Sequence, residues 1–292
     1  MTVKKKSKTN EGRKSRCGLH TSTAGGLMEM LGRDRSLGED AAQIFVKSNR
    51  QWGMGKLGDE EREWFVKAKR EMDLWVGAHA GYLVNTAGAS EIRKKSILSL
   101  AEEIRRGEEL ELEVVVVHCG SRGESPVAQA IHRALNGFVE ALERSGTRRI
   151  RLALENSAGQ GAYLAGGIEE WGELVCGLPA ARRAACLDTA HAFAAGFDLR
   201  TEEGRKKLIE SCARWVGLDQ LAVLHVNDSK TECGSRVDRH EHLGHGRIGA
   251  RGLQAFLADG RLAEIPRIAE LPPGEREDRE NLAFLRKGTG SS

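Results

Sequence analysis

Residues 112–120 read LEVVVVHCG, and this stretch decides how the chain folds. Its four consecutive valines show no alternation of polar and apolar side chains. A strand of this kind is covered on both faces, as in a parallel sheet packed between helices. The run ends in His118, a polar side chain at the carboxyl end of the strand. The segment therefore predicts an α/β fold with polar side chains at its strand ends.

Similar apolar runs recur along the chain at intervals of about 25 to 40 residues, separated by longer charged segments. The expected strands are 17–22, 42–48, 74–80, 112–120, 149–157, 184–191, 221–228 and 266–271. Eight parallel strands fit a closed barrel better than an open sheet, and a chain of 292 residues lies within the range of such barrels. We therefore expect a single (β/α)8 TIM barrel.

Two of the connecting segments are typical of outer-ring helices. Residues 91–107 place Ile92, Ile97, Leu100 and Ile104 on one helical stripe, and Gly107 is expected to end that helix. Residues 127–146 carry a second stripe, with Gly146 closing the helix; its inward side chains are Ala130, Ala134, Leu135, Phe138, Ala141 and Leu142.

The barrel domain is expected over residues 16–287, between a flexible basic N-terminal tail at 1–15 and a flexible C-terminal tail at 288–292. The basic tail is interpreted as a solubilising terminus, with attraction to phosphate as the alternative. No apolar run approaches the roughly 18 residues of a membrane span, and no secretory signal is recognisable. We expect a cytoplasmic protein, associated with the nucleoid if bacterial, whose six scattered cysteines are free thiols. The net charge of +3 by itself favours no class of partner.

Every apolar run from the third onward ends in a histidine or a carboxylate. These residues are His79, His118, Glu155, Asp188 with His191, His225 and Glu270. The carboxyl ends of all strands of a barrel meet at one mouth, which carries the active site. A mixture of imidazole and carboxylate groups at that mouth favours a polynuclear metal site.

A further pair of candidate ligands, Asp238 and His240, lies in the loop 234–246 with one residue between them. An Asp-x-His step presents two ligands to one ion when the backbone is extended. Nine candidates, with one carboxylate bridging, are enough for three ions. His132, His242 and His245 are interpreted as structural or surface residues, and pairing His240 with His242 is the alternative.

Long segments of the chain resemble the signature stretches of the endonuclease IV family, in the same order and over about residues 17 to 271. They are HTSTAGGL (20–27), KSNRQW (47–52), LALENSAGQG (152–161), LDTAHAFAAGFDLR (187–200), LHVND (224–228) and GSRVDRHEHLGHGRIG (234–249). The resemblance implies a trinuclear zinc site at the barrel mouth. One ion would use His79, His118 and Glu155, a second would use Glu155, Asp188, His225 and Glu270, and the third would use His191, Asp238 and His240.

The resemblance also implies an activity. Family members are DNA base-excision repair endonucleases that hydrolyse the phosphodiester 5′ to an abasic site, leaving a 3′-hydroxyl and a 5′-deoxyribose phosphate, and related enzymes trim blocked 3′ ends. The implied nucleophile is a metal-bridging hydroxide. Glu155 and Glu270 are the expected catalytic carboxylates that orient it, with Asn227 and Asp228 supporting the ligands. The expected partner is double-stranded DNA, and we expect a monomer.

Positions that match the family's DNA-contacting loops are expected to meet the duplex. Arg50 and Tyr82 would enter the base stack at the lesion. Their expected neighbours on the DNA are Gln51, Trp52, Asn85, Ser235, Arg236 and Arg239. For Trp52, ordinary packing under a loop is the alternative.

The chain departs from the family pattern at a few positions. Cys119 follows His118 where a proline is common, Arg122 stands where another residue type is usual, and the tract after Glu270 is atypical. We expect these changes to alter loop geometry and to leave the metal ligands in place.

Two other functions compete with the nuclease. A metal-dependent sugar isomerase or epimerase on a related barrel would need only one or two ions, and it would not need the segments SNRQW and VDRH. A protein that binds lesions without cutting would be expected to have lost a ligand, and all nine positions carry an acceptable one.

Overall fold

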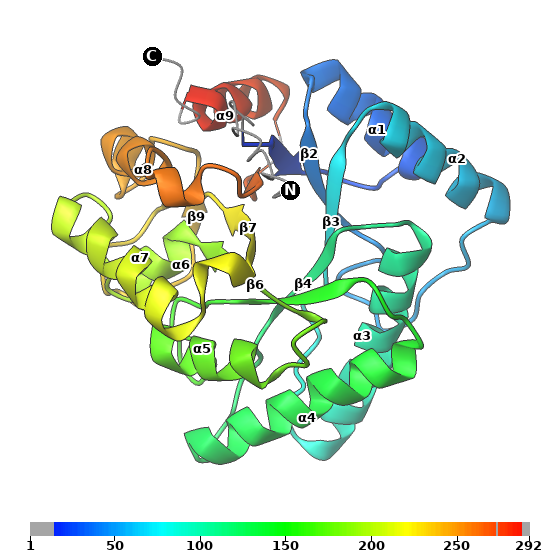
Figure 1. Cartoon of the computed structure of the whole chain (residues 1–292), viewed down its shortest axis with the longest axis horizontal. Helices are drawn as coiled ribbons and strands as arrows, with labels where there is room; N and C mark the ends of the chain where they lie inside the picture. Colours follow the sequence, from blue (N-terminus) through cyan, green and yellow to red (C-terminus); the bar gives the residue numbers. More distant parts are fainter. Residues whose placement is uncertain (1–14, 273, 288–292) are drawn as a thin grey trace, which may run out of the picture.

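The computed structural model, which describes residues 15–272 and 274–287, contains a closed barrel of eight parallel strands (Figure 1). The strands are β1 (Cys17–His20), β2 (Ala41–Phe45), β3 (Trp75–His79), β4 (Val114–His118), β5 (Arg151–Glu155), β6 (Arg183–Asp188), β7 (Leu221–His225) and β10 (Arg267–Ala269). They follow chain order around the barrel, which closes where β1 pairs with both β2 and β10. The predicted TIM barrel is confirmed.

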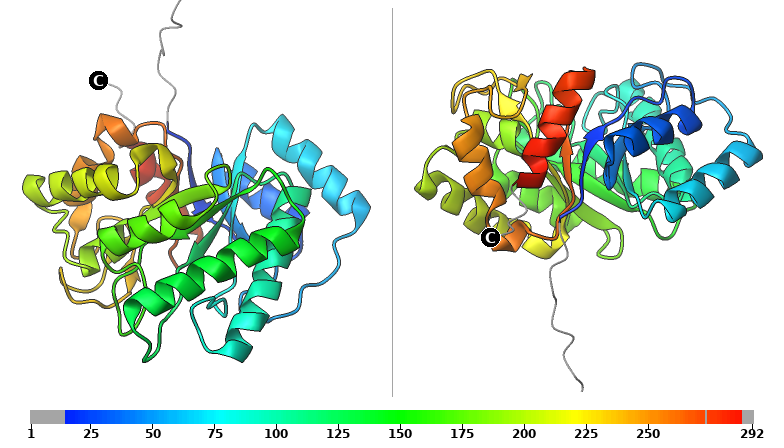
Figure 2. Two further views of the ribbon diagram at one scale, coloured as in Figure 1. Left: turned by 60° about the horizontal axis from the view of Figure 1, so that its bottom comes forward. Right: turned by 90° about the horizontal axis from the view of Figure 1, so that it is seen from above.

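Helices surround the barrel and cover the outer faces of its strands (Figure 1). They are α1 (Leu27–Leu37), α2 (Asp59–Glu71), α3 (Ser90–Glu109), α4 (Val127–Ser145), α5 (Ile168–Gly177), α6 (Thr189–Ala194), α7 (Glu202–Trp215), α8 (Gly249–Leu257) and α9 (Glu275–Lys287), with 3₁₀ turns at Leu218–Gln220 and Gly260–Leu262. The last helix, α9, packs beside β1, so the two ends of the fold lie side by side (Figure 2). A short ribbon of β8 (Asp228–Ser229) and β9 (His240–Glu241) lies in the loop after β7.

The alternation of side chains along each strand divides the apolar residues into two layers. Val114 and Val116 of β4 belong to the small cluster inside the barrel, together with Ala153, Ala184 and Val223 of the following strands. The intervening positions of β4, such as Val115 and Val117, pack outward against the helices. The four valines therefore supply both layers.

The helix α3 differs from its prediction in two respects. It continues two residues past the expected stop, because Gly107 lies inside the helix. A Cβ atom on Gly107 would come within 2.5 Å of Ile150 Cδ1, so the glycine permits close packing of the helix. Ile92 was expected to face the core but is 47% exposed. It lies in the first turn of α3, where it lines the cavity at the barrel mouth.

The described residues bear on several other expectations about organisation, and Ser15 departs from the predicted flexible tail. Gly146 closes α4 in the left-handed conformation, at φ 68°. The six cysteines are unpaired. No helix in the described ranges is both long and apolar enough to cross a membrane. Of the predicted tails, residues 1–14 and 288–292 lie outside the described residues, and Ser15 is buried and donates to the Ile265 carbonyl at 2.6 Å.

Candidate metal centre and DNA-binding face

The same alternation that fills the barrel interior also aims the candidate ligands into its mouth. His118 lies two residues beyond Val116, Glu155 two beyond Ala153, and Asp188 two beyond Cys186. Residues two apart on a strand share a face, so a polar side chain at the strand end stands directly above an interior apolar one. The floor of the site is therefore apolar and its wall is polar.

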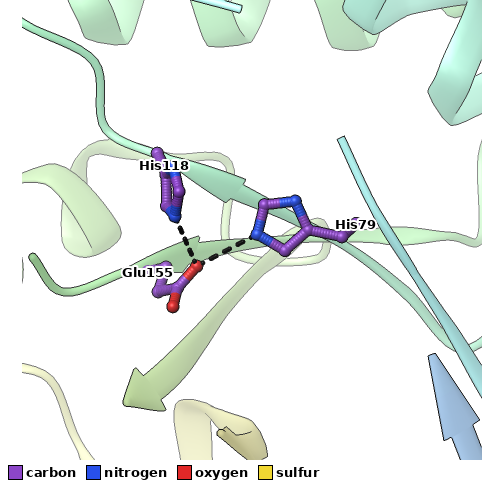
Figure 3. Close-up of side chains that lie close together, drawn as sticks. All are labelled: His79, His118 and Glu155. Atoms are coloured by element: carbon purple, nitrogen blue, oxygen red, sulfur yellow. Dashed lines mark hydrogen bonds and ion pairs between the residues drawn. The ribbon is translucent and has the colours of Figure 1, made fainter. Parts of the chain in front are cut away.

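Glu155 on β5 lies between two histidines of the preceding strands (Figure 3). Its Oε2 lies 3.2 Å from Nε2 of His79 and 3.2 Å from Nε2 of His118. Glu155 is fully buried, whereas the side chain of His118 is 31% exposed. The three side chains present their ligand atoms within 4.8 Å of one another.

The second oxygen of Glu155 faces a different group. Its Oε1 lies 3.0 Å from Nδ1 of His225, and the same Nδ1 lies 3.1 Å from Oε2 of Glu270. Together with Asp188, these residues form another set of ligand atoms within 4.8 Å. Glu155 thus connects the two sets through its two oxygens.

A third set lies at the rim, between α6 and the loop before β9. Asp238 reaches both histidines of this set, with its Oδ2 3.2 Å from Nε2 of His191 and its Oδ1 3.3 Å from Nε2 of His240. Asp188 lies 3.7 Å from the same nitrogen of His240. The structure thus brings the nine predicted ligand residues to one mouth. In the third group, the ligand atoms that lie within 4.8 Å of one another are those of Asp188, His191 and His240, and Asp238 joins them through its two ion pairs. His242 contacts Asn281 away from the mouth.

The hydrogen bonds of the histidines determine which ring nitrogen each one offers. Nδ1 of His79 faces the Ala80 carbonyl at 2.7 Å, Nδ1 of His191 faces the Asn156 carbonyl at 2.9 Å, and Nδ1 of His240 faces the Glu270 carbonyl at 3.0 Å. A carbonyl oxygen accepts only, so the ring proton is assigned to Nδ1 and the lone pair to Nε2. In each ring that Nε2 points to the carboxylates.

His225 turns its other ring nitrogen, Nδ1, toward the carboxylates. Its Nε2 faces Oε1 of Gln43 at 2.8 Å, which leaves Nδ1 for Glu155 and Glu270. Nε2 of His240 is buried, and it lies 3.3 Å from Oδ1 of Asp238 and 3.7 Å from Oδ2 of Asp188. A buried imidazole lone pair beside carboxylates is suited to a cation, so the donor set fits zinc.

At the mouth, the carboxylates and histidines shift one another's pKa values in opposite directions. Burial would raise the pKa of Glu155, but the charges of His225 and His118 outweigh it and hold that pKa well below its ordinary value. Burial lowers the pKa of His240, yet the charge of Asp188 and a hydrogen bond with Asp238 raise it overall to about 9. Positive charge, whether from protons or from cations, is therefore strongly favoured in this mouth.

Two further residues of the site were missed by the sequence analysis. His20, the last residue of β1, places Nδ1 3.1 Å from Oε1 of Glu270, and Gln43 of β2 donates to that same oxygen at 2.6 Å. Gln43 thus orients both Glu270 and His225. The signal was present for His20, which ends the first apolar run as His79 ends the third, whereas an uncharged glutamine within an apolar run gave none.

Asn227 and Asp228 support the site from behind β7. Nδ2 of the Asn227 side chain donates to Oδ2 of Asp188 at 2.6 Å, and its Oδ1 accepts from the backbone N–H of Glu270 at 2.8 Å. The Asp228 carboxylate accepts backbone N–H groups of the loop 244–249, including those of Gly246 at 3.0 Å and Ile248 at 2.9 Å. Asn227 holds ligands directly, and Asp228 shapes the loop that follows them.

The site opens into a cavity of about 810 Å³ at the barrel mouth. Of the predicted DNA contacts, Tyr82, Asn85 and Arg239 line this cavity. Tyr82 is 57% exposed and stacks on His118 with the ring centroids 6.4 Å apart. The other predicted contacts lie outside the cavity lining: Arg50, Gln51, Ser235 and Arg236 are exposed, and Trp52 is half-buried.

Asn85 also has a structural role. Its amide nitrogen donates to the Ser121 carbonyl and its amide oxygen accepts from the Ser121 amide, both at 3.1 Å. Both polar atoms of the side chain are therefore engaged in joining the loops that follow β3 and β4. Its contact with DNA stays a prediction.

The departures at Cys119 and Arg122 have clear local consequences. Cys119 is buried and its thiol lies 3.4 Å from the Glu155 carbonyl, so it packs against the strand that carries the central ligand. Arg122 donates to the Ser125 carbonyl at 2.9 Å and lines a second hollow of about 800 Å³ next to the mouth. That hollow also contains the cationic side chains Arg93, Lys94 and Arg133.

Tyr163 is a further residue of the mouth that the sequence analysis did not single out. It is 53% exposed, lines the same cavity as Tyr82, and is the only other tyrosine of the chain. The backbone on either side of it pairs with the loop after β4, through Arg122 to Ala162 and Leu164 to Gly120, each at 2.9 Å. An exposed ring on an anchored backbone suits contact with a ligand.

Comparisons with known proteins place the chain in a family. Residues 34–288 match the family model described as xylose isomerase-like TIM barrel. The probable endonuclease 4 of Chloroflexus aurantiacus is 37% identical over 276 residues, which cover 93% of this chain and 97% of that protein. The probable endonuclease 4 of Nitratidesulfovibrio vulgaris is 35% identical, with 94% and 98% covered.

Solved structures give the same grouping. Endonuclease IV from Thermus thermophilus superposes with a TM-score of 0.86 at 37% identity, covering 94% of this chain and 98% of that one. A D-tagatose 3-epimerase-like protein has a TM-score of 0.73 at 19% identity, and this likeness concerns the fold alone. The full-length identity and the shared fold together show that the chain belongs to the endonuclease IV family of xylose isomerase-like TIM barrels.

Proposed function

We propose that the protein is a zinc-dependent DNA-repair endonuclease that hydrolyses the phosphodiester 5′ to abasic sites, leaving a 3′-hydroxyl, and that also trims blocked 3′ ends. The observation that carries the proposal is the orientation of His79, His191 and His240. Each ring uses Nδ1 on a backbone carbonyl and turns Nε2 toward carboxylates in one mouth. The family relationship supports the nuclease class.

The residues that would hold zinc fall into three sets that share ligands. The first is His79, His118 and Glu155, and the second is Glu155, Asp188, His225 and Glu270. The third is His191, Asp238 and His240, and Asp188 of the second set also lies close to His191 and His240. Bound zinc supplies Lewis acidity, which neutralises phosphate charge and lowers the pKa of water.

Glu155 and Glu270 have a second role in the proposed mechanism, as the carboxylates that orient the attacking water. Glu270 suits this role because His20 and Gln43 both hold its Oε1, while its Oε2 faces His225. Burial raises the pKa of Glu270, but the charge of His225 outweighs it, and the pKa lies well below the ordinary value. The side chain therefore stays ionised and accepts hydrogen bonds.

The proposed duplex-binding face surrounds the mouth. Tyr82 and Arg50 would fill the gap that the abasic nucleotide leaves in the base stack. Burial raises the pKa of Tyr82 to about 12, so its phenol stays uncharged beside the phosphates. The hollow lined by Arg93, Arg122 and Arg133 supplies positive charge next to the mouth, as a phosphate backbone requires.

The test combines metal analysis with incision of a duplex that carries one abasic site. The purified protein is expected to hold about three zinc ions per chain and to cut 5′ to the lesion. Glu155→Gln should lower the incision rate at least about 100-fold, because Glu155 joins two of the ligand sets. His132→Ala, on the exposed side of α4, is the matched control and should cut normally. One metal or none, with an uncut duplex and turnover of a ketose instead, would contradict the nuclease.

A further inference from the structure

Outside the metal centre, one buried ion pair lies beneath the predicted DNA-contacting loops. Lys47, two residues after β2, and Glu103, in the middle of α3, lie 3.5 Å apart from Nζ to Oε1. Their side chains are only 3% and 1% exposed. The proposed mechanism uses neither of them.

Each hydrogen of the Lys47 ammonium has a partner. Nζ donates to the carbonyls of Gln51 at 2.8 Å and Trp52 at 3.0 Å, and to Oγ of Ser99 at 2.6 Å. Lys47 therefore closes its own loop, residues 47–52, from the inside and attaches it to α3. We call this segment the first loop.

Glu103 holds a second segment, residues 81–85, which we call the second loop. Its Oε2 accepts from the Gly81 amide at 2.8 Å, and its Oε1 accepts from Ser99 Oγ at 3.0 Å. The two loops also touch directly, because the Tyr82 amide donates to the Asn49 carbonyl at 3.0 Å. The ion pair, Ser99 and this hydrogen bond form one connected unit beneath both loops.

A buried ion pair contributes little to stability, because removing two charges from water costs about as much as their attraction returns. Such a pair does fix geometry, since its directional hydrogen bonds are satisfied in only one arrangement. Here the groups that it fixes are the backbone next to Arg50 and Tyr82. The pair therefore ties together the two backbone segments that carry these side chains.

We propose that the Lys47–Glu103 pair is a positioning device that holds the first and second loops in the relative arrangement needed to engage the two sides of a lesion together. The inference rests on the proposed nuclease function and adds two positioning residues to it. Neither residue is expected to contact DNA.

The test removes both charges at once, so that no lone buried charge remains. In the double variant Lys47→Met/Glu103→Gln, zinc content and hydrolysis of bis(4-nitrophenyl) phosphate should equal those of the wild type, because the metal ligands are untouched. The KM for an abasic duplex should rise about tenfold with kcat changed much less. Hydrogen exchange of the first and second loops in the free protein should become faster.

The matched control is another buried lysine next to a glutamate, far from the two loops. Lys69 on α2 donates to the Glu111 carbonyl and lies 4.0 Å from Glu113. Lys69→Met/Glu113→Gln should leave the KM and the exchange of both loops unchanged. An increase in KM for this control equal to that of the Lys47 variant would overturn the proposal, because the effect would then be general loss of stability.

Two other outcomes also overturn it: unchanged loop exchange in the Lys47 variant, or faster exchange with an unchanged KM. Failure of the proposed function is distinguishable from these. In that case the wild type itself leaves the abasic duplex uncut, while the exchange measurement still decides whether the pair holds the loops.

Discussion

The barrel mouth and the layer between barrel and helices both bury charged side chains, but they partner them differently. At the mouth, Glu155 and His225 contact other titratable side chains. In the outer layer, Arg267 donates to the carbonyls of Leu257 at 2.9 Å and Leu285 at 3.3 Å, near the ends of α8 and α9. Charges that satisfy backbone groups serve the fold, whereas charges that converge on one another are suited to binding an ion.

The comparison predicts the largest effect for removal of metal from the mouth. A chelator should abolish incision and lower the melting temperature, and added Zn²⁺ should restore both. One ion held at about 1,000 times its dissociation constant stabilises the folded state by about 4 kcal/mol. Calorimetry with and without chelator measures this. A melting temperature that is unchanged by the chelator would show that the mouth is stable without metal.

An intermediate effect is expected for the outer layer, and it should appear in stability rather than in activity. Arg267→Leu leaves the Leu257 and Leu285 carbonyls without their donor and should lower the free energy of unfolding by about 2 kcal/mol. Its kcat should stay within about twofold, since the metal ligands do not change. Urea denaturation and incision assays measure the two quantities. Arg276→Leu, an exposed arginine of α9, is the control for losing a charge. If Arg267→Leu lost activity at unchanged stability, the distinction between a catalytic mouth and a structural outer layer would be wrong.

The smallest effect concerns a pair of buried acids between α1 and the first two strands. Burial raises the pKa of Asp34 to about 7 and that of Glu39 to about 9. Between its ordinary pKa and about 7, Asp34 keeps a proton in the folded protein that the unfolded chain releases. Stability is therefore fully present at low pH and falls as the pH rises through this window.

Asp34→Asn should remove this penalty. The free energy of unfolding of the variant, relative to that of the wild type, should increase by on the order of 1 kcal/mol from pH 5 to pH 8. Urea denaturation at each pH measures this difference. Asp59→Asn, an exposed acid at the start of α2, should show a difference from the wild type that does not vary over this range. A stability difference for Asp34→Asn that is equal at both pH values would contradict the raised pKa.

The sequence predicted the barrel and the nine candidate ligands because both depend on order along the chain. Apolar runs in βα alternation specify parallel strands, and the residue that ends each run must stand at the mouth. The family resemblance added the grouping of ligands. Residues such as Gln43 were not predictable, because its role depends on Glu270, far away in the sequence and on a strand that only barrel closure brings near.

Local patterns were insufficient where packing decided the outcome. Gly107 has the chemistry of a helix stop, yet the approach of Ile150 makes it a packing residue inside α3. Ile92 has the spacing of a core residue, yet it is exposed and lines the cavity at the barrel mouth. In both cases the placement of the helix against the barrel outweighed the local preference.

The sequence by itself determined that the polar residues ending the strands, such as Glu155 and His225, reach the mouth, since the two-residue period of a strand and the order of the strands leave no other place for them. Only the tertiary structure decided which nitrogen each histidine offers, how Glu155 divides its two oxygens, and that Lys47 and Glu103 meet beneath two loops. The physical reason is that periodicity is local, whereas hydrogen bonds and ion pairs between distant segments exist only after the barrel has closed.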